Sequence, residues 1–160
     1  MAFDAPVIGI DLGGTNTLAC VLLPDGTIAG RAHRATDAGR GAAAVIDGLA
    51  DAARAACGEA GVDMTDIATV GIAVCGAVDH TAGVVLATGA LDWKDVPLSA
   101  ELHARLERPI VLENDVNAAA WGEYRLGAGR GADGMIAAWV GTGIGGGIIL
   151  NDRLYHGPRG

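Results

Sequence analysis

The chain has 160 residues with a formal net charge of −8, and 26 of its residues are glycine. This length can bury the hydrophobic core of one domain or slightly more. The acidic balance, with no cluster of Lys and Arg to offset it, disfavours duplex nucleic acid and anionic membranes as partners. We therefore expect a small-molecule ligand, and an anionic one would need backbone amides or a metal ion.

Cysteine usage and the lack of an apolar leader predict a cytoplasmic protein. Cys20, Cys57 and Cys75 are scattered and odd in number, as expected for free thiols in a reducing compartment. The amino terminus has no basic region typical of a signal peptide. Residues 135–150 form the longest uncharged run, which five glycines interrupt and which is shorter than the roughly 20 residues of a membrane helix.

The first predicted elements are two strands joined by a glycine turn. Residues 7–10 are rich in β-formers, and Gly13 and Gly14 can take positive φ and let a ligand approach the backbone closely. Asp11 at the strand end is predicted to hold a divalent cation, and the N–H groups of the turn to hold phosphate oxygens. The alternative is a tight hairpin without a ligand.

Hydrophobic periodicity then predicts an alternation of strands and helices. The exit of the strand that ends near residue 74 is a candidate ligand-binding loop, because α/β sheets bind ligands at strand ends. We expect that strand to be buried on both faces. The expected elements are strands over 18–23, 27–32, 67–74, 84–86 and 110–112, helices over 42–56 and 98–106, and loops over 36–41, 75–79 and 92–94.

A polar cluster precedes the alanine-rich helix expected over residues 116–126. Glu113, Asn114 and Asp115 lie where a strand turns into that helix. A carboxylate in the first turn of a helix faces the positive end of the macrodipole, which keeps it ionised. Asp115 is therefore predicted to act as a base, with Asn114 holding a neighbouring hydroxyl. The alternative is simple helix capping, for which Asn and Asp are preferred residues.

A second glycine turn follows at residues 141–146, between strands expected over 135–140 and 147–150. It matches G-x-G-x-x-G at Gly141, Gly143 and Gly146, but a dinucleotide-binding motif requires a helix afterwards, and a strand follows instead. We interpret the two glycine turns as facing loops that hold the phosphates of a nucleotide. The chain has no Gly-Lys-Ser/Thr sequence, which excludes the P-loop class.

Four segments, in order, resemble motifs of the ROK family of sugar kinases (repressor, open reading frame, kinase), which belongs to the actin-like, ribonuclease-H-like ATPase superfamily. Residues 10–16 and 141–147 match its two phosphate motifs. Residues 71–79 are similar to the loop that lies against the sugar, and residues 113–119 match the catalytic motif. The resemblance covers nearly the whole chain.

This resemblance implies an α/β fold with a mixed sheet: an amino-terminal ribonuclease-H-like domain over residues 1–112 and the first part of a second, catalytic domain over residues 113–160. It implies phosphorylation of a hexose or N-acetylhexosamine hydroxyl, the 6-OH in a glucokinase-like enzyme, by ATP with Mg²⁺. Asp115 would be the catalytic base, and Asn114, Gly76 and Glu113 would bind the sugar. The implied cofactor-binding residues are Asp11, Gly13, Gly14, Thr15, Asn16, Gly141, Thr142, Gly143, Gly145 and Gly146, with Asp11 also holding the Mg²⁺, directly or through water.

The sequence departs from the family pattern in two places. Family members continue into a Glu-x-Gly-His segment, a zinc site and the adenosine-binding part, so we expect this chain alone to lack the zinc site and to be inactive. Residues 90–92, before Trp93, lack the asparagine that binds sugar hydroxyls in many family kinases, which leaves the identity of the sugar open.

An alternative function is a non-catalytic, truncated actin-like domain that binds a nucleotide, a partner chain or a second copy through the surface its missing half would cover. A repressor is not expected, because its DNA-binding extension would precede the first phosphate motif.

The histidines and tryptophans are not expected to bind a metal or a ligand. His33, His80, His103 and His156 share no ligand spacing and are expected on the surface or in loops, and Trp93, Trp121 and Trp139 are expected to pack.

Overall fold

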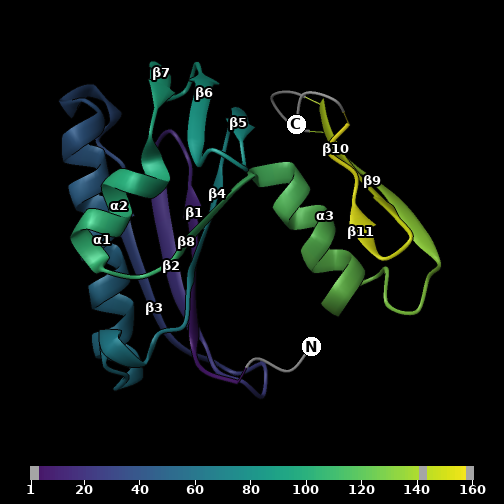
Figure 1. Ribbon diagram of the computed structural model, residues 1–160, viewed down its shortest axis with the longest axis horizontal. Coiled ribbons are helices and arrows are strands. Elements are labelled where there is room, and N and C mark those ends of the chain that lie inside the picture. Colours follow the sequence, from purple (N-terminus) through teal and green to yellow (C-terminus); the bar gives the residue numbers. More distant parts are fainter. Residues whose placement is uncertain (1–3, 141–143, 158–160) are drawn as a thin grey trace.

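A mixed sheet of five strands forms the centre of the amino-terminal part (Figure 1), in the order β3-β2-β1-β4-β8. The structure is a computed structural model that describes residues 4–140 and 144–157. The first three strands form an antiparallel meander, and β4 and β8 continue it parallel to β1. The strands are β1 (Val7–Leu12), β2 (Asn16–Leu22), β3 (Ile28–Ala35), β4 (Val70–Val74) and β8 (Ile110–Asn114).

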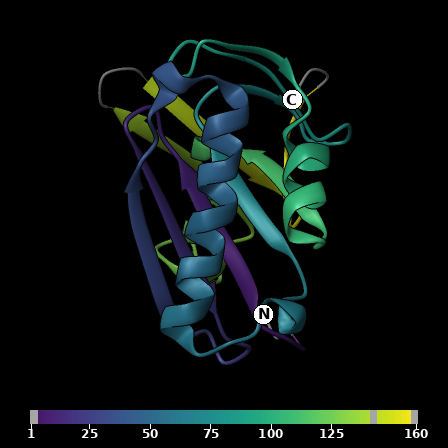
Figure 2. The same cartoon turned by 90° about the vertical axis from the view of Figure 1, so that its left-hand side faces the viewer.

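Two helices, α1 (Ala42–Ala60) and α2 (Leu98–Leu106), cover one face of this sheet, as Figure 2 shows from that side. Helix α1 ends at Gly61, whose left-handed φ of 66° lets its N–H reach the carbonyls of the last turn. Gly30 of β3 lets α1 approach the sheet, because a Cβ there would lie 2.3 Å from the carbonyl oxygen of Ala56. Single 3-10 turns, η1 (Ala38–Arg40) and η2 (Met64–Asp66), flank α1 in the sequence.

Strand alternation places one side of β1 and β4 in the core and the other side towards the open face of the sheet. Ile8, Ile10 and Leu12 point to the helices and are buried. Gly71 and Ala73, on the other side of β4, are only partly buried. The expectation of a strand buried on both faces is therefore wrong for β4. Gly and Ala on its second side are themselves apolar, so the sequence of this run does not show which side is open.

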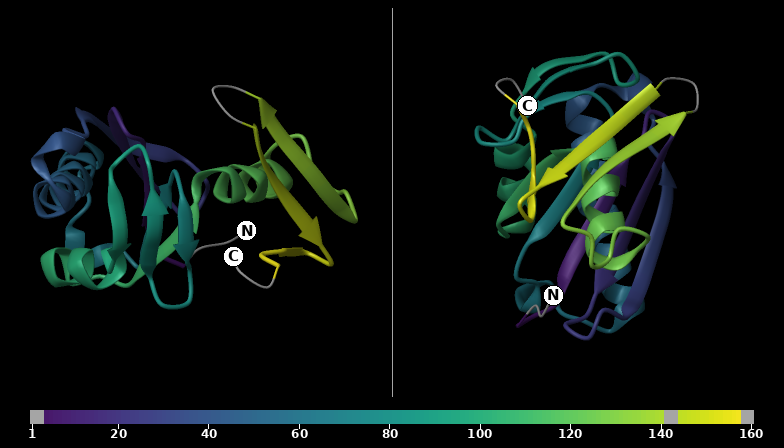
Figure 3. Two further views of the ribbon diagram at one scale, coloured as in Figure 1. Left: turned by 90° about the horizontal axis from the view of Figure 1, so that it is seen from above. Right: turned by 90° about the vertical axis from the view of Figure 1, so that its right-hand side faces the viewer.

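A separate three-stranded sheet, β5-β6-β7, lies beyond one end of the main sheet (Figure 3). Its strands are β5 (Ala77–Asp79), β6 (Val84–Thr88) and β7 (Trp93–Val96). Two of them replace the loops expected over residues 75–79 and 92–94. Strands of three or four residues show no clear period, and here they are stabilised by pairing with β6 and by burial of Val78 and Trp93.

The carboxy-terminal part consists of α3 (Asp115–Leu126) and a ribbon of three strands, β9 (Gly134–Val140), β10 (Ile144–Leu150) and β11 (Arg153–Leu154). Strand β10 lies against α3, because Gly145 and Gly147 leave no side chain between them: a Cβ on Gly147 would lie 2.4 Å from that of Ala120. The predicted domain boundary at residues 112/113 falls inside β8, and the division into two domains stays a prediction. No helix among the described residues has both the length and the apolar composition that a bilayer span needs.

Candidate active site

The first glycine turn joins β1 to β2 and is tied down by a residue from the end of β3. The N–H of Gly13 donates to the carbonyl of Asn16 at 3.0 Å. Thr36 donates through Oγ1 to the carbonyl of Gly13 at 2.8 Å and through its N–H to that of Thr15 at 2.9 Å. Nε2 of His33 donates to Oδ1 of Asn16 at 3.0 Å. Thr36 therefore fixes the shape of the turn, although the sequence marks it only as part of a polar loop.

The two glycines of this turn are needed for room and not for their φ angles. Neither Gly13 nor Gly14 has a positive φ, so the conformational reason expected from the sequence is wrong. A Cβ on Gly14 would lie 2.9 Å from that of Ala90, and one on Gly13 would lie 3.1 Å from the carbonyl oxygen of Asn16. The turn is thus packed against the loop before Trp93, the segment that lacks the sugar-binding asparagine of many ROK kinases.

Asp11, at the end of β1, and Asp115, at the start of α3, line the same cavity of about 460 Å³. Ala73 and Trp139 line it too, which brings the end of β9 to this site. Burial raises the pKa of Asp11, and the negative charge of Asp115 raises it further. A cation bound in this cavity would offset the repulsion between the two carboxylates. The described part of the chain has no group of three or more His, Cys, Asp or Glu able to hold a metal, so such a cation would take its other ligands from water or phosphate, as Mg²⁺ often does.

Asn114 caps α3 and also holds Asp115. Its Oδ1 accepts from the N–H groups of Val116 and Asn117 at 3.0 and 3.1 Å, which confirms the capping interpretation. Its Nδ2 donates to the carbonyl of Gly76 at 3.0 Å and to Oδ1 of Asp115 at 2.9 Å. Both functional groups of this amide are engaged, and a sugar-binding role for Asn114 stays a prediction.

Asp115 has one oxygen that is held in place and one that is available. Oδ1 accepts from Asn114 and, at 2.9 Å, from the N–H of Val116. Oδ2 has no hydrogen-bond partner among the described residues. A carboxylate fixed through one oxygen, at a helix amino terminus and on a cavity wall, meets the geometric needs of a general base.

Glu113 meets His156, which comes from the loop after β11. Nε2 of His156 donates to Oε2 of Glu113 at 2.6 Å, and the other oxygen accepts from the N–H of Asn114 and from Nδ2 of Asn117. The ring of His156 also stacks on that of His80, with centroids 4.0 Å apart. A loop position for His156 is confirmed, but its ring is only 23% exposed because Glu113 and His80 hold it.

Gly76, the third predicted sugar ligand, lies between β4 and β5 with φ 144°. A Cβ there would lie 2.4 Å from the carbonyl oxygen of Ala87, so only glycine fits. Its carbonyl accepts from Asn114, which links this loop to the start of α3. Whether Gly76 contacts a sugar stays a prediction.

The second glycine turn is described only in part. Gly141, Thr142 and Gly143 lie outside the described residues. Gly145 and Gly146 belong to β10, which begins three residues earlier than expected, and a Cβ on Gly145 would lie 2.7 Å from Cγ2 of Val116. No helix follows β10 among the described residues, so the literal G-x-G-x-x-G match is not a dinucleotide motif there. Nucleotide binding by this turn stays a prediction.

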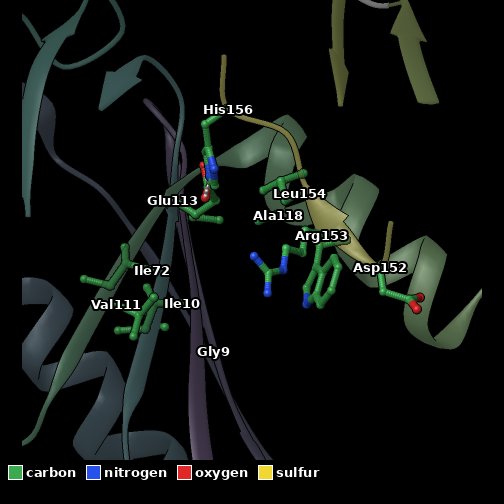
Figure 4. Close-up of a pocket in the computed structure, with 13 residues that line it drawn as sticks. Gly9, Ile10, Ile72, Val111, Glu113, Ala118, Asp152, Arg153, Leu154 and His156 are labelled. Atoms are coloured by element: carbon green, nitrogen blue, oxygen red, sulfur yellow. Dashed lines mark hydrogen bonds and ion pairs between the residues drawn. The ribbon is translucent and has the colours of Figure 1, made fainter. Parts of the chain in front are cut away.

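A larger cavity of about 610 Å³ lies between the open face of the main sheet and β11 (Figure 4). Its walls are mostly small or apolar residues, such as Gly9, Ile72, Val111 and Leu154, with Glu113 and His156 at one end. It holds neither Asp11 nor Asp115. Asp11 and Asp115 are brought together by the smaller cavity.

Known proteins similar to this chain include kinases of sugars. A glucokinase from Streptomyces coelicolor is 38% identical over 154 residues, which cover 96% of this chain and 46% of that protein. The crystal structure of a ROK family glucokinase from Streptomyces griseus, in complex with glucose and AMPPNP, has a TM-score of 0.85 and 40% identity over 95% of this chain and 46% of the other. A ROK hexokinase from Thermus thermophilus has a TM-score of 0.85 and 36% identity, covering 97% of this chain and 50% of its own.

The chain thus spans about half the length of the proteins it matches. The similarity to these kinases confirms the predicted α/β fold of the actin-like, ribonuclease-H-like class. The model of the ROK family matches residues 7–160, almost the full sequence. With the four motifs and the shared fold, this match shows that the chain belongs to the ROK family.

Proposed function

We propose that the protein to which this chain belongs transfers the γ-phosphoryl group of ATP to a hydroxyl of a hexose or N-acetylhexosamine. The observation that carries the proposal is the cavity shared by Asp11 and Asp115, at the ends of β1 and β8. Ligands of α/β proteins bind at such strand ends. The similarity to glucokinases supports the substrate class.

Asp115 is the proposed base. Oδ2 accepts the proton of the sugar hydroxyl while the hydroxyl oxygen attacks the γ-phosphorus. The bond between the γ-phosphorus and the β–γ bridging oxygen breaks, and ADP leaves. Asn114 keeps the carboxylate oriented through Oδ1. Positioning and charge neutralisation supply most of the acceleration in phosphoryl transfer. In a glucokinase-like reaction, the hydroxyl that attacks the phosphorus is the 6-OH.

The proposed phosphate sites are the two glycine turns. The turn over residues 13–16 would offer the Thr15 hydroxyl and its backbone N–H groups other than that of Gly13, which donates to Asn16. Residues 141–146 would face this turn with Gly141, Thr142, Gly143, Gly145 and Gly146. Asp11 fits a Mg²⁺ ligand because it is a carboxylate oxygen donor that shares a cavity with a second carboxylate, Asp115. Bound Mg²⁺ would neutralise phosphate charge. Asn114, Gly76 and Glu113 are proposed around the sugar.

The test is an assay of ADP release with a panel of hexoses and N-acetylhexosamines, on this chain and on a chain extended by a carboxy-terminal half like that of the relatives. We expect turnover by the longer chain only. Asp115→Asn should lower its kcat at least about 100-fold, the usual contribution of a general base. Asp66→Asn, an exposed carboxylate in η2, is the matched control. Activity that survives Asp115→Asn would remove Asp115 as the base.

One observation favours the second candidate, a non-catalytic domain that binds a partner chain. The face of the β9–β10 ribbon away from α3 is apolar, and Ile136, Val140 and Ile144 are 80%, 80% and 82% exposed. Nucleotide binding without turnover by either chain would favour this function, with a homodimer as its simplest form. A cytoplasmic location and the lack of nucleic-acid or membrane partners remain predictions.

A further inference from the structure

Three side chains that are far apart in the sequence meet beside the proposed base. His80 comes from the hairpin between β5 and β6, Glu113 from the end of β8 just before α3, and His156 from the loop after β11. Figure 4 shows Glu113 and His156 joined by a dashed line. The cluster therefore connects the amino-terminal part of the chain to the ribbon at the point where α3 begins.

Glu113 works as an anchor for the strand-to-helix junction. Its Oε1 accepts from the N–H of Asn114 at 2.9 Å and from Nδ2 of Asn117 at 3.1 Å. One carboxylate oxygen thus holds both the residue that precedes the helix and the end of its first turn. The side chain is only 18% exposed, so water gives it little support and its second oxygen depends on His156.

The anchor acts on Asp115 through Asn114. Asn114 must stay in place to cap α3, to reach the carbonyl of Gly76 and to hold Oδ1 of Asp115. If the Glu113 carboxylate turned away, the N–H of Asn114 and the amide of Asn117 would lose their acceptor. The orientation of Oδ2 on Asp115 would then be less restricted.

We propose that His156 is a positioning residue for the base Asp115, acting through Glu113 and supported by stacking on His80. This proposal rests on the proposed kinase function for its kinetic consequence but not for its structural one. His156 contributes one charge-assisted hydrogen bond to Oε2, the strongest kind available to a carboxylate. His80 stacks on one face of this ring and so restricts its tilt.

The kinetic test uses the extended chain with a saturating sugar. His156→Ala should lower kcat about 10-fold and leave the KM for ATP within about 2-fold, because a misplaced base weakens the transition state and not nucleotide binding. His156→Gln, which keeps an N–H donor, should recover most of the loss. His103→Ala, a histidine of α2 outside this cluster, is the matched control and should leave kcat unchanged.

Three kinetic results would overturn the proposal. One is an unchanged kcat in His156→Ala. Another is a lower kcat accompanied by an equally large change in the KM for ATP. The third is a loss that His156→Gln does not recover, since a residue needed only for packing would behave in that way.

Hydrogen exchange separates this proposal from the proposed function. In the 160-residue chain, the amides of Asn114, Val116 and Asn117 should exchange at least about 5-fold faster in His156→Ala, while those of β1 stay unchanged. His156→Gln should keep the slow exchange. If no form shows kinase turnover, the proposed function fails, and exchange alone decides: faster exchange at these three amides supports the anchor, and unchanged exchange overturns it.

Discussion

The amino-terminal sheet and the β9–β10 ribbon differ in how far their apolar side chains are buried. In the first region, the side chains that α1 and α2 cover form one continuous core, and Ile46 is 2% exposed. In the second, Ala120, Tyr124 and Ile149 make up the small buried cluster between α3 and the ribbon, while Ile136 on the opposite face is 80% exposed. Both regions are apolar in sequence, but only the first buries most of its apolar residues within the described chain.

This difference shows which region of the chain is stabilised by its own buried core. Burial of apolar area stabilises a fold by roughly 25 cal/mol per Å², so the first region carries most of the stability. The ribbon has apolar residues on both faces, a pattern typical of strands that are covered on both sides. Its inner face meets α3, and the apolar residues of its outer face are exposed. Three tests by substitution can break or sharpen this comparison.

The largest effect is expected from the same change made in both regions. Ile46→Ala should lower the free energy of unfolding by about 2–5 kcal/mol, because it leaves a cavity in the core. Ile136→Ala should change it by less than about 0.5 kcal/mol. Urea denaturation of both variants measures the difference. A large loss from Ile136→Ala, dependent on protein concentration, would mean that copies of the chain already cover the outer face.

An intermediate effect is expected where the ribbon contacts α3. Gly147→Ala should weaken that contact by about 1–3 kcal/mol through overpacking against Ala120. Gly122→Ala is the control: it lies on α3 with open space around it and should stabilise the helix by roughly 0.5–1 kcal/mol. Hydrogen exchange should show faster opening of β9 and β10 in Gly147→Ala and an unchanged β1. Equal loss of protection in both regions would show that they unfold as one unit.

The smallest effect is expected at the join, where Asp11 of the first region faces Asp115 at the start of α3. The folded-state pKa of Asp11 is raised from 3.8, so ionised Asp11 destabilises the fold as pH rises through its titration. Asp11→Asn should therefore raise the Tm at pH 7 by roughly 1–3 °C, because the desolvation of this partly exposed carboxylate, with the added repulsion from Asp115, costs under about 1 kcal/mol. The gain should vanish below pH 3.8, where the carboxyl is protonated in both states.

Magnesium gives this last comparison a control. Mg²⁺ should raise the Tm of the unsubstituted chain more than that of Asp11→Asn, because a ligand that binds only the folded state stabilises it. A lower Tm of Asp11→Asn at pH 7 without Mg²⁺ would contradict the repulsion between Asp11 and Asp115. An equal response of both forms to Mg²⁺ would remove Asp11 as its ligand.

Local sequence patterns predicted the elements that have a period or a strong turn signal. The opening hairpin, both helices on the main sheet and the strand-to-helix junction at Glu113 are confirmed. Strands β5 and β7 were missed because tertiary pairing, and not propensity, stabilises such short segments. The glycine turn at residues 13–14 was located correctly, although its physical reason is close packing.

The sequence predicts those site residues that lie at the ends of strands. Because β1 and β8 lie in one sheet with β4 between them, Asp11 and Asp115 emerge at the same edge. Thr36 and His156 were missed as contacts, because their partners lie 23 and 43 residues away in the sequence. No local pattern encodes such a separation, and only the folded chain brings these groups together.

The amide of Asn114 has a consequence for which residue types this position tolerates. It accepts two hydrogen bonds through one end and donates two through the other, in four directions. An aspartate keeps the acceptor but would turn a negative oxygen towards Asp115 and the carbonyl of Gly76, and a serine has one proton to give where two are needed. Among the short polar side chains, only the carboxamide has both ends that this corner requires.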